Sequence, residues 1–285
     1  MPVVERDGVA IHYQVRGRPE APPLLLIMGL GFSSRAWGRL PARLEGRFRV
    51  IVFDNRGTGL SGRPNGFYSM SDLADDAAAV LTATGVSSWG GAFVFGVSMG
   101  GMIAQQLVLR HPQLVASMVL GATFASWVRS DKPAIDVGLK LLGVNLLGSR
   151  AAPLLVPLLV SPEFLSRNAA ELNEWLRQTG LDDGAALVRQ LGAIAQHSTV
   201  EHLSRIACPT LIVTGTADRI VPPANSRLLA ARIPGARLVE LPGAGHVFPL
   251  EREDETVELL ESHFLGPPVE ATRGGGRRRV RSVTR

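Results

Sequence analysis

The sequence has few of the features that mark secreted, disulfide-linked or membrane-spanning proteins. Cys208 is its single cysteine, so no disulfide can form within the chain. Its most apolar window, residues 139–160, is interrupted by two basic residues and two prolines, which argues against a membrane span. The first residues include acids and lack a long apolar stretch, so we expect no secretory signal and a cytoplasmic location.

Excess positive charge is absent outside one end of the sequence. The formal net charge is +5. Residues 266–285 hold six arginines and one acid, so they account for all of it, and residues 1–265 sum to zero. With three consecutive glycines and few apolar residues, this segment is expected to be a disordered basic tail. The alternative is an electrostatic tether to phosphate or anionic lipid. Without interleaved aromatic residues, the tail is not expected to bind nucleic acid specifically.

Short apolar runs alternate with segments of helical spacing along most of the chain. This alternation predicts an α/β fold, with a mostly parallel sheet and helices on both faces. The expected buried strands are 24–28, 50–53, 93–97, 118–120, 211–214 and 238–241, and residues 9–15 alternate like an antiparallel edge strand. The expected helices are 71–84 with Ser71 as N-cap, 99–110 and 251–264.

The alternation breaks once. From about residue 124 to 206 the chain is rich in leucine and helical in pattern, with no convincing strand. This predicts an inserted helical subdomain at 124–206, a core formed by residues 1–123 and 207–265, and the tail at 266–285.

The stretch FVFGVSMGGM, residues 93–102, places one serine between glycines where a buried strand runs into a helix. In that context the pattern Gly-x-Ser-x-Gly describes a nucleophile elbow. The turn is so tight that a Cβ at Gly96 or Gly100 is expected to clash with backbone, and Ser98 is expected to be strained. The free N–H groups of the following helix suit an oxyanion. We therefore interpret Ser98 as a nucleophile; the alternative is an incidental serine in a glycine-rich turn.

A serine hydroxyl needs a base to take its proton. Of six histidines, His246 stands on a short, turn-rich loop after a late strand, LPGAGH, where glycines let the backbone aim the ring over the sheet. The other histidines are expected to be structural, with His197 and His202 kept as alternative pocket residues.

The base needs a carboxylate to fix its tautomer. Asp218 is the only acid on the short loop after the strand at 211–214. Asp54 also follows a strand, but it precedes Ser98 in the chain, and we interpret it as a turn residue that bonds local backbone. Ser98, Asp218 and His246 thus follow the chain order expected of an α/β-hydrolase fold.

With these motifs the sequence resembles the α/β-hydrolase superfamily over nearly all of residues 3–265, in its serine-nucleophile, esterase- or lactonase-like branch with a helical cap. The resemblance rests on LLLIMGLGFSSRAW, FDNRGTGLSG, GVSMGG, GTADRIVP and PGAGH. It implies that residues 124–206 cap the active site and that the backbone N–H groups of Leu30 and Met99 form the oxyanion hole. Where the family has a His-Gly pair, this chain has Met28-Gly29.

The resemblance implies acyl transfer on a small hydrophobic ester, lactone or thioester, without cofactor or metal. Four aromatic residues are candidates to line the substrate pocket: Phe32, Trp37, Trp127 and Phe248. Carbon–carbon bond hydrolysis and perhydrolysis remain alternatives with the same three residues, and so does a non-hydrolytic cyclase or ligand receptor. The oligomeric state is left open.

Overall fold

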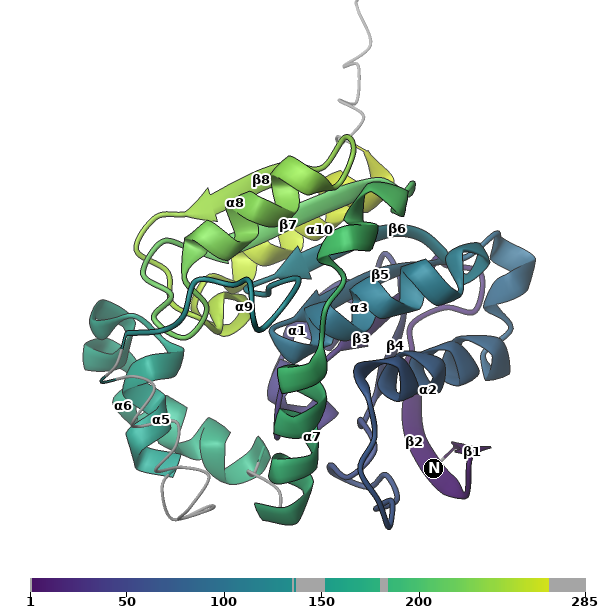
Figure 1. The fold of residues 1–285 in the computed structure, drawn as a ribbon, viewed down its shortest axis with the longest axis horizontal. Helices are drawn as coiled ribbons and strands as arrows, with labels where there is room; N and C mark the ends of the chain where they lie inside the picture. The colour runs from purple at the N-terminus through teal and green to yellow at the C-terminus, as the bar shows by residue number, and fades with distance from the viewer. Residues whose placement is uncertain (1, 135, 137–151, 180–183, 267–285) are drawn as a thin grey trace, which may run out of the picture.

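The computed structural model describes residues 2–134, 136, 152–179 and 184–266. Its strands are β1 (Val3–Arg6), β2 (Val9–Arg16), β3 (Pro23–Ile27), β4 (Arg49–Phe53), β5 (Ala92–Val97), β6 (Val115–Gly121), β7 (Thr210–Gly215) and β8 (Arg237–Leu241). They form one eight-stranded sheet in the described part of the chain, in the order β1-β2-β4-β3-β5-β6-β7-β8 (Figure 1). β2 is antiparallel to both neighbours, and all pairings from β4 to β8 are parallel. The predicted α/β fold is therefore confirmed.

The strand expected at residues 9–15 is present and antiparallel, but its expected place at the edge of the sheet is wrong. Residues 9–15 belong to β2, which is the second strand of the sheet, and β1 forms the edge. The two are joined by the turn Asp7-Gly8, in which both residues have positive φ, 50° and 72°. Asp-Gly is the dipeptide that such two-residue hairpin turns prefer, so the sequence did contain a signal for the missed strand.

Helices cover both faces of the sheet. α2 (Met70–Ala83), α3 (Met99–Arg110) and α8 (Pro223–Arg232) pack on one face, while α1 (Leu40–Leu44) and α10 (Glu253–Leu265) pack on the other. Alternate residues of β3 divide between the two cores: Leu25 and Ile27 face the first, Leu24 and Leu26 the second. Because both faces are covered, the parallel strands appear in the sequence as continuous apolar runs.

Two helix boundaries differ from those expected. The N-cap of α2 is Ser69 and not Ser71: the Asp72 N–H donates to Ser69 Oγ at 3.2 Å, and the Ser69 N–H donates to Asp72 Oδ2 at 2.8 Å. This reciprocal capping box fixes the helix start. The expected helix at 251–264 is two elements, a short α9 (Phe248–Glu251) followed by α10.

Between β6 and β7 the described elements are all helices. They are α5 (Ala152–Leu159), α6 (Pro162–Thr179), α7 (Gly184–Gln196) and the 3-10 helix η5 (Val200–Arg205). The one strand-like pairing there is an isolated bridge between Ser126 and Ser198. In Figure 1, α5, α6 and α7 lie outside the layers of the sheet and its covering helices. None of the described helices combines the length and apolar character needed to cross a membrane. Except for Gly266, the expected tail lies outside the described residues.

Candidate active site

Ser98 lies at the turn where β5 ends and α3 begins. Its backbone has φ 58° and ψ −122°, a region that residues other than glycine rarely adopt. A Cβ at Gly96 would overlap the carbonyl of Gly100, and a Cβ at Gly100 would overlap the carbonyl of Ile27. The turn therefore has the strain and the crowding that the glycine pattern predicted.

His246 and Asp218 meet on the two loops that follow β8 and β7. Nδ1 of His246 lies 2.8 Å from Oδ2 of Asp218, and both side chains are buried. The other carboxylate oxygen, Oδ1, accepts hydrogen bonds from the N–H groups of Ile220 and Val221, each at 2.9 Å. Since a carboxylate only accepts, Nδ1 carries the proton of the neutral ring and Nε2 is left as the acceptor.

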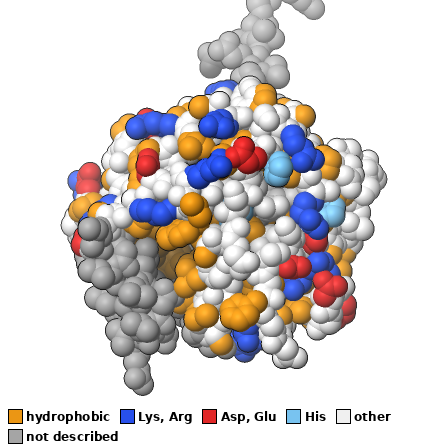
Figure 2. All heavy atoms as spheres, viewed as in Figure 1, with side chains coloured by type: hydrophobic (Ala, Val, Ile, Leu, Met, Phe, Trp, Pro, Cys, Tyr) orange, Lys and Arg blue, Asp and Glu red, His pale blue; other side chains and the backbone are white. Residues whose placement is uncertain are grey.

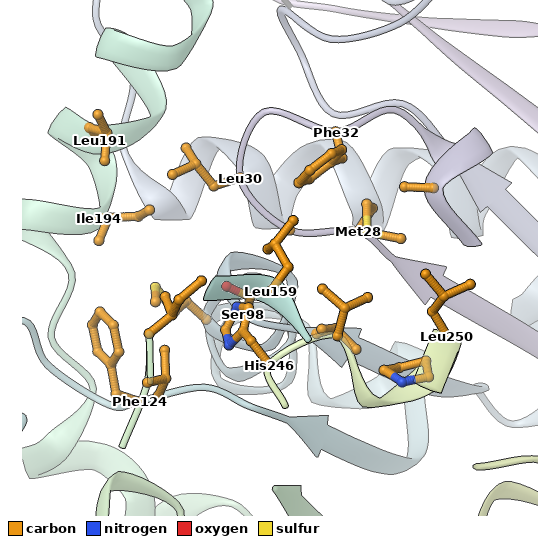
Figure 3. Close-up of a pocket in the computed structure, with 18 of the residues that line it drawn as sticks. Met28, Leu30, Phe32, Ser98, Phe124, Leu159, Leu191, Ile194, His246 and Leu250 are labelled. Atoms are coloured by element: carbon orange, nitrogen blue, oxygen red, sulfur yellow. The ribbon is translucent and has the colours of Figure 1, made fainter. Parts of the chain in front are cut away.

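Ser98 and His246 line one cavity of about 420 Å³. In Figure 2 hydrophobic side chains gather around a hollow in the region that α6 and α7 flank in Figure 1. Figure 3 shows Ser98 and His246 inside the pocket. The hydrogen bonds recorded among the described residues do not include one from Ser98 Oγ to His246. Such contacts often tighten only when substrate is bound, and this one stays a prediction.

The loop after β3 approaches the serine closely. A Cβ on Gly29 would lie 3.1 Å from Cβ of Ser98. Among the described residues, the N–H groups of Leu30 and Met99 donate no recorded hydrogen bond. For Met99 the reason is its position as first residue of α3, where an N–H has no partner within the helix. Met99 on the turn itself and Leu30 on the loop after β3 therefore each carry an N–H with no partner among the described residues.

The pocket is almost entirely apolar. Phe32, Trp37 and Trp127 line it, as expected, but Phe248 does not. The Phe248 side chain is 1% exposed and packs into the sheet against Phe95, with ring centroids 6.4 Å apart. It follows His246 closely in the sequence, but as the first residue of α9 it packs into the core. The sequence reasoning missed most of the aliphatic lining, which includes Leu159, Leu187, Leu191, Ile194, Val221 and Leu250.

The two alternative histidines do not line this pocket. His197 is buried behind it, with its ring centroid 6.4 Å from that of Phe124. Burial, only partly offset by the Phe124 backbone, lowers the pKa of His197 to about 4. The ring is therefore neutral near pH 7 and supports the wall of the pocket from behind. His202 lies on η5.

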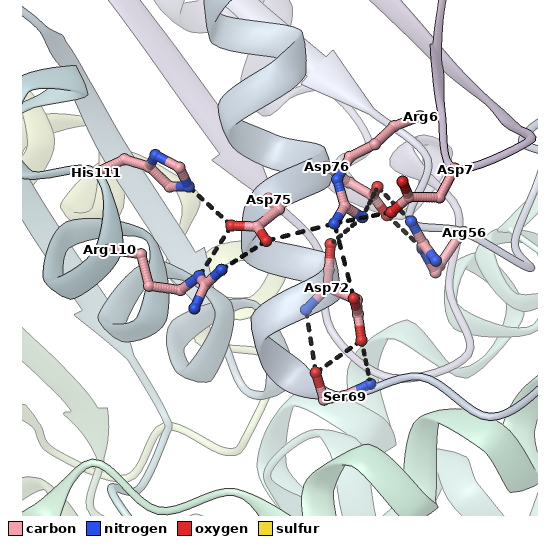
Figure 4. Close-up of polar contacts among 9 residues, drawn as sticks. All are labelled: Arg6, Asp7, Arg56, Ser69, Asp72, Asp75, Asp76, Arg110 and His111. Carbon is pink, nitrogen blue, oxygen red and sulfur yellow. Dashed lines mark hydrogen bonds and ion pairs between the residues drawn. The ribbon is translucent and has the colours of Figure 1, made fainter.

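A cluster of charged residues lies outside the pocket (Figure 4). At its centre the fully buried carboxylate of Asp76 accepts two hydrogen bonds from Arg56, each 2.6 Å, and one from Arg6 at 3.1 Å. Burial lowers the pKa of Arg56, but the bonds and charge of Asp76 outweigh this and raise it. The cluster joins β1 and the turn after β4 to α2, so we interpret it as structural. Asp54 in that turn accepts from the Leu60 N–H, as predicted.

The chain is similar to known alpha/beta hydrolases. The model of the alpha/beta hydrolase family matches residues 24–259. A Serratia proteamaculans protein named "Putative carbamate hydrolase RutD" is 35% identical over 262 residues, which are 90% of this chain and 96% of that protein. A pimeloyl-[acyl-carrier protein] methyl ester esterase of Aeromonas hydrophila is 28% identical, over 87% of this chain and 96% of the esterase.

Among solved structures, an enol-lactonase from Burkholderia xenovorans superposes with a TM-score of 0.81 at 28% identity, over 93% of this chain and 100% of that chain. The chain belongs to the alpha/beta hydrolase family, which confirms the resemblance found in its motifs. The family and these relatives support a hydrolase of the α/β fold.

Proposed function

We propose that the protein is a serine hydrolase that cleaves a carboxylic ester, lactone or thioester of a hydrophobic small molecule through an acyl-enzyme. One observation carries the proposal. A strained serine and a histidine held by a buried carboxylate line one apolar cavity, and the N–H groups of Leu30 and Met99 have no hydrogen-bond partner among the described residues. These are the parts that nucleophilic acyl transfer requires.

In the proposed mechanism, Ser98 Oγ attacks the substrate carbonyl while Nε2 of His246 takes its proton. Asp218 holds the ring and stabilises the imidazolium that forms. The N–H groups of Leu30 and Met99 hydrogen-bond to the oxyanion. His246 then gives the proton to the leaving alkoxide or thiolate, and the acyl-enzyme forms. Water activated by the same nitrogen releases the acid and restores Ser98.

The cavity supports a hydrophobic acyl group as substrate. Its lining is aliphatic and aromatic, and its volume of about 420 Å³ suits a small molecule. We propose that α5, α6 and α7 form a cap over it, since each contributes to the lining, through Leu159, Trp175 and Leu187 respectively. Two relatives are named for cleaving a methyl ester and an enol lactone, and both reactions are acyl transfers of this type.

The experiment compares esters, lactones, thioesters and carbamates with apolar or charged acyl groups as substrates for the wild type and Ser98→Ala. We expect kcat/KM to be highest for apolar acyl groups, and Ser98→Ala to lower kcat by about 10⁶, as nucleophile removal does in a serine protease. Ser87→Ala, at an exposed serine far from the pocket, is the matched control. Binding of these compounds without turnover by the wild type would instead favour a receptor or cyclase.

A further inference from the structure

The loop after β3, residues 28–34, carries one proposed oxyanion donor, and the turn after β4 holds both of its ends. Nδ2 of Asn55 donates to the carbonyl of Met28 at 3.0 Å. Oδ1 of Asp54 accepts from the Ser34 N–H at 2.7 Å. These bonds fix the ends of the loop to the sheet, but they do not reach its middle, where Leu30 lies.

The middle of the loop is held from a different part of the chain. The Gly31 N–H donates to Oε1 of Gln190 at 2.8 Å. Gln190 belongs to α7, more than 150 positions later in the sequence (the two residues are 159 apart). Because the N–H is a donor, the amide atom that faces it has to be the oxygen, so the orientation of this amide is fixed by chemistry. Gly31 has φ 75°, which places a sharp turn directly after Leu30.

The position of Gln190 on its helix is unusual for a polar residue. It is fully buried, and Leu187 and Ile194, three positions before it and four after it, share its helical face and line the pocket. Figure 3 shows Leu191 and Ile194 on α7 and Leu30 on the loop. Burying an amide in such a stripe is unfavourable unless it makes a hydrogen bond, and an aliphatic residue there would fill the same space without that penalty. The bond to Gly31 gives Oε1 of this buried amide its partner.

We propose that Gln190 is a positioning residue for the oxyanion hole. By holding the peptide N–H of Gly31, it keeps the neighbouring N–H of Leu30 directed at the reacting carbonyl over Ser98. The oxyanion hole is then complete only when α7 is docked, which couples the helices between β6 and β7 to the chemistry. The inference rests on the proposed function. It also predicts a kinetic signature, because an oxyanion develops only on the way to the transition state.

The experiment uses three variants and two ligands. Gln190→Met removes the acceptor and keeps an unbranched side chain of similar length, Gln190→Glu retains an acceptor, and Gln196→Met is the control at an exposed position of α7. One ligand is a trifluoromethyl ketone. Ser98 Oγ can add to its carbonyl carbon, which forms a tetrahedral oxyanion. The other is the alcohol of the same skeleton, which binds the pocket but forms no oxyanion.

We expect Gln190→Met to lower kcat by about 10- to 100-fold with KM little changed, somewhat less than the loss of an oxyanion donor itself. The affinity of Gln190→Met for the trifluoromethyl ketone should fall by a similar factor, while its affinity for the alcohol should stay at the wild-type value. Gln190→Glu should recover most of kcat, and Gln196→Met should match the wild type. If Gln190→Met does not fold, Gln190→Asn withdraws the acceptor by one methylene, and the same loss of kcat is expected of it.

Wild-type kcat in a folded variant that lacks the acceptor would overturn the inference. So would an equal loss of affinity for the ketone and the alcohol, because that indicates a deformed pocket and not a displaced oxyanion donor. Ser98→Ala separates the two proposals. If that variant keeps its activity, the proposed function fails; if it is inactive while Gln190→Met is unaffected, only the role of Gln190 fails.

Discussion

Asp218 holds His246 with one carboxylate oxygen, 2.8 Å from Nδ1, and is itself held through the other oxygen by the N–H groups of Ile220 and Val221. The loop after β7 therefore fixes the orientation of the carboxylate independently of its contact with the His246 ring. This places the proton of the neutral imidazole on Nδ1 and leaves Nε2 as an acceptor, which is what the proposed mechanism requires of it.

Replacing Asp218 by Asn tests this relationship. The Asn amide has the same shape, but its nitrogen would donate to Nδ1 and so place the ring proton on Nε2, where it blocks base catalysis. We expect kcat at neutral pH to fall by about 10⁴, with KM little changed and the fold intact by circular dichroism. A loss of less than about tenfold would contradict the role of Asp218, given the size of the effect in a serine protease.

The crowding at the elbow leads to a prediction about stability. In Gly100→Ala the new Cβ would overlap the carbonyl of Ile27 in the neighbouring strand, so backbone would have to move to admit it. We expect urea unfolding to show a loss of at least about 3 kcal/mol, in the range of severe core overpacking. Gly46→Ala, where a Cβ meets nothing within 4 Å, is the matched control and should stay within about 0.5 kcal/mol of the wild type.

The cluster around Asp76 predicts a contrast between two ion pairs. Asp76→Ala leaves the buried guanidinium of Arg56 without its counter-ion, so the free energy of unfolding should fall by about 3–5 kcal/mol. Arg129 and Glu201 form a pair whose side chains are 58% and 65% exposed, so Arg129→Ala should cost less than about 1 kcal/mol. Equal effects on denaturant midpoints would show that Asp76 is not the centre of the cluster.

His197 predicts how stability depends on pH. Its pKa is about 4 in the folded protein, against 6.5 for the free side chain, because burial disfavours the charged ring. The unfolded chain therefore binds more protons between these values, and stability falls as pH drops below 6.5 until it levels off near 4. For this residue alone the loss from pH 8 to pH 5 is about 2 kcal/mol.

His197→Gln, which does not titrate, should lack that part of the decline. The measurement is the free energy of unfolding of both proteins at pH 8 and pH 5. The change between the two pH values is then compared between the proteins, so that the contribution of the carboxylates, which both proteins share, cancels. Parallel declines in the two proteins would contradict the neutral, buried state of His197.

The sequence was enough to predict features that depend on local backbone. Ser98, Asp218 and His246 each stand on a short loop after a parallel strand, and parallel strands carry such loops to one edge of the sheet. The glycines around Ser98 by themselves indicate the tight turn. The N-cap at Ser69 was missed because Ser71 offered the same chemistry two positions later, although only Ser69 has an acid three residues on.

Features that depend on packing between distant segments could not be predicted. Phe248 was expected in the pocket because it follows His246 closely, but at the start of α9 it packs into the core against Phe95. The bond from Gly31 to Gln190 joins two segments with no shared motif. Its only sequence signal is a glutamine within an aliphatic stripe, which has meaning only once α7 is known to face the pocket.

The most direct test of the central proposal is the intact mass of the folded protein after incubation with a fluorophosphonate. The reagent phosphonylates a serine only where a base and an oxyanion hole activate it. We predict one adduct, located on Ser98 by peptide mapping, absent from Ser98→Ala and formed far more slowly by His246→Ala. A folded wild type that stays unmodified, or that carries the adduct on a different residue, would contradict the account.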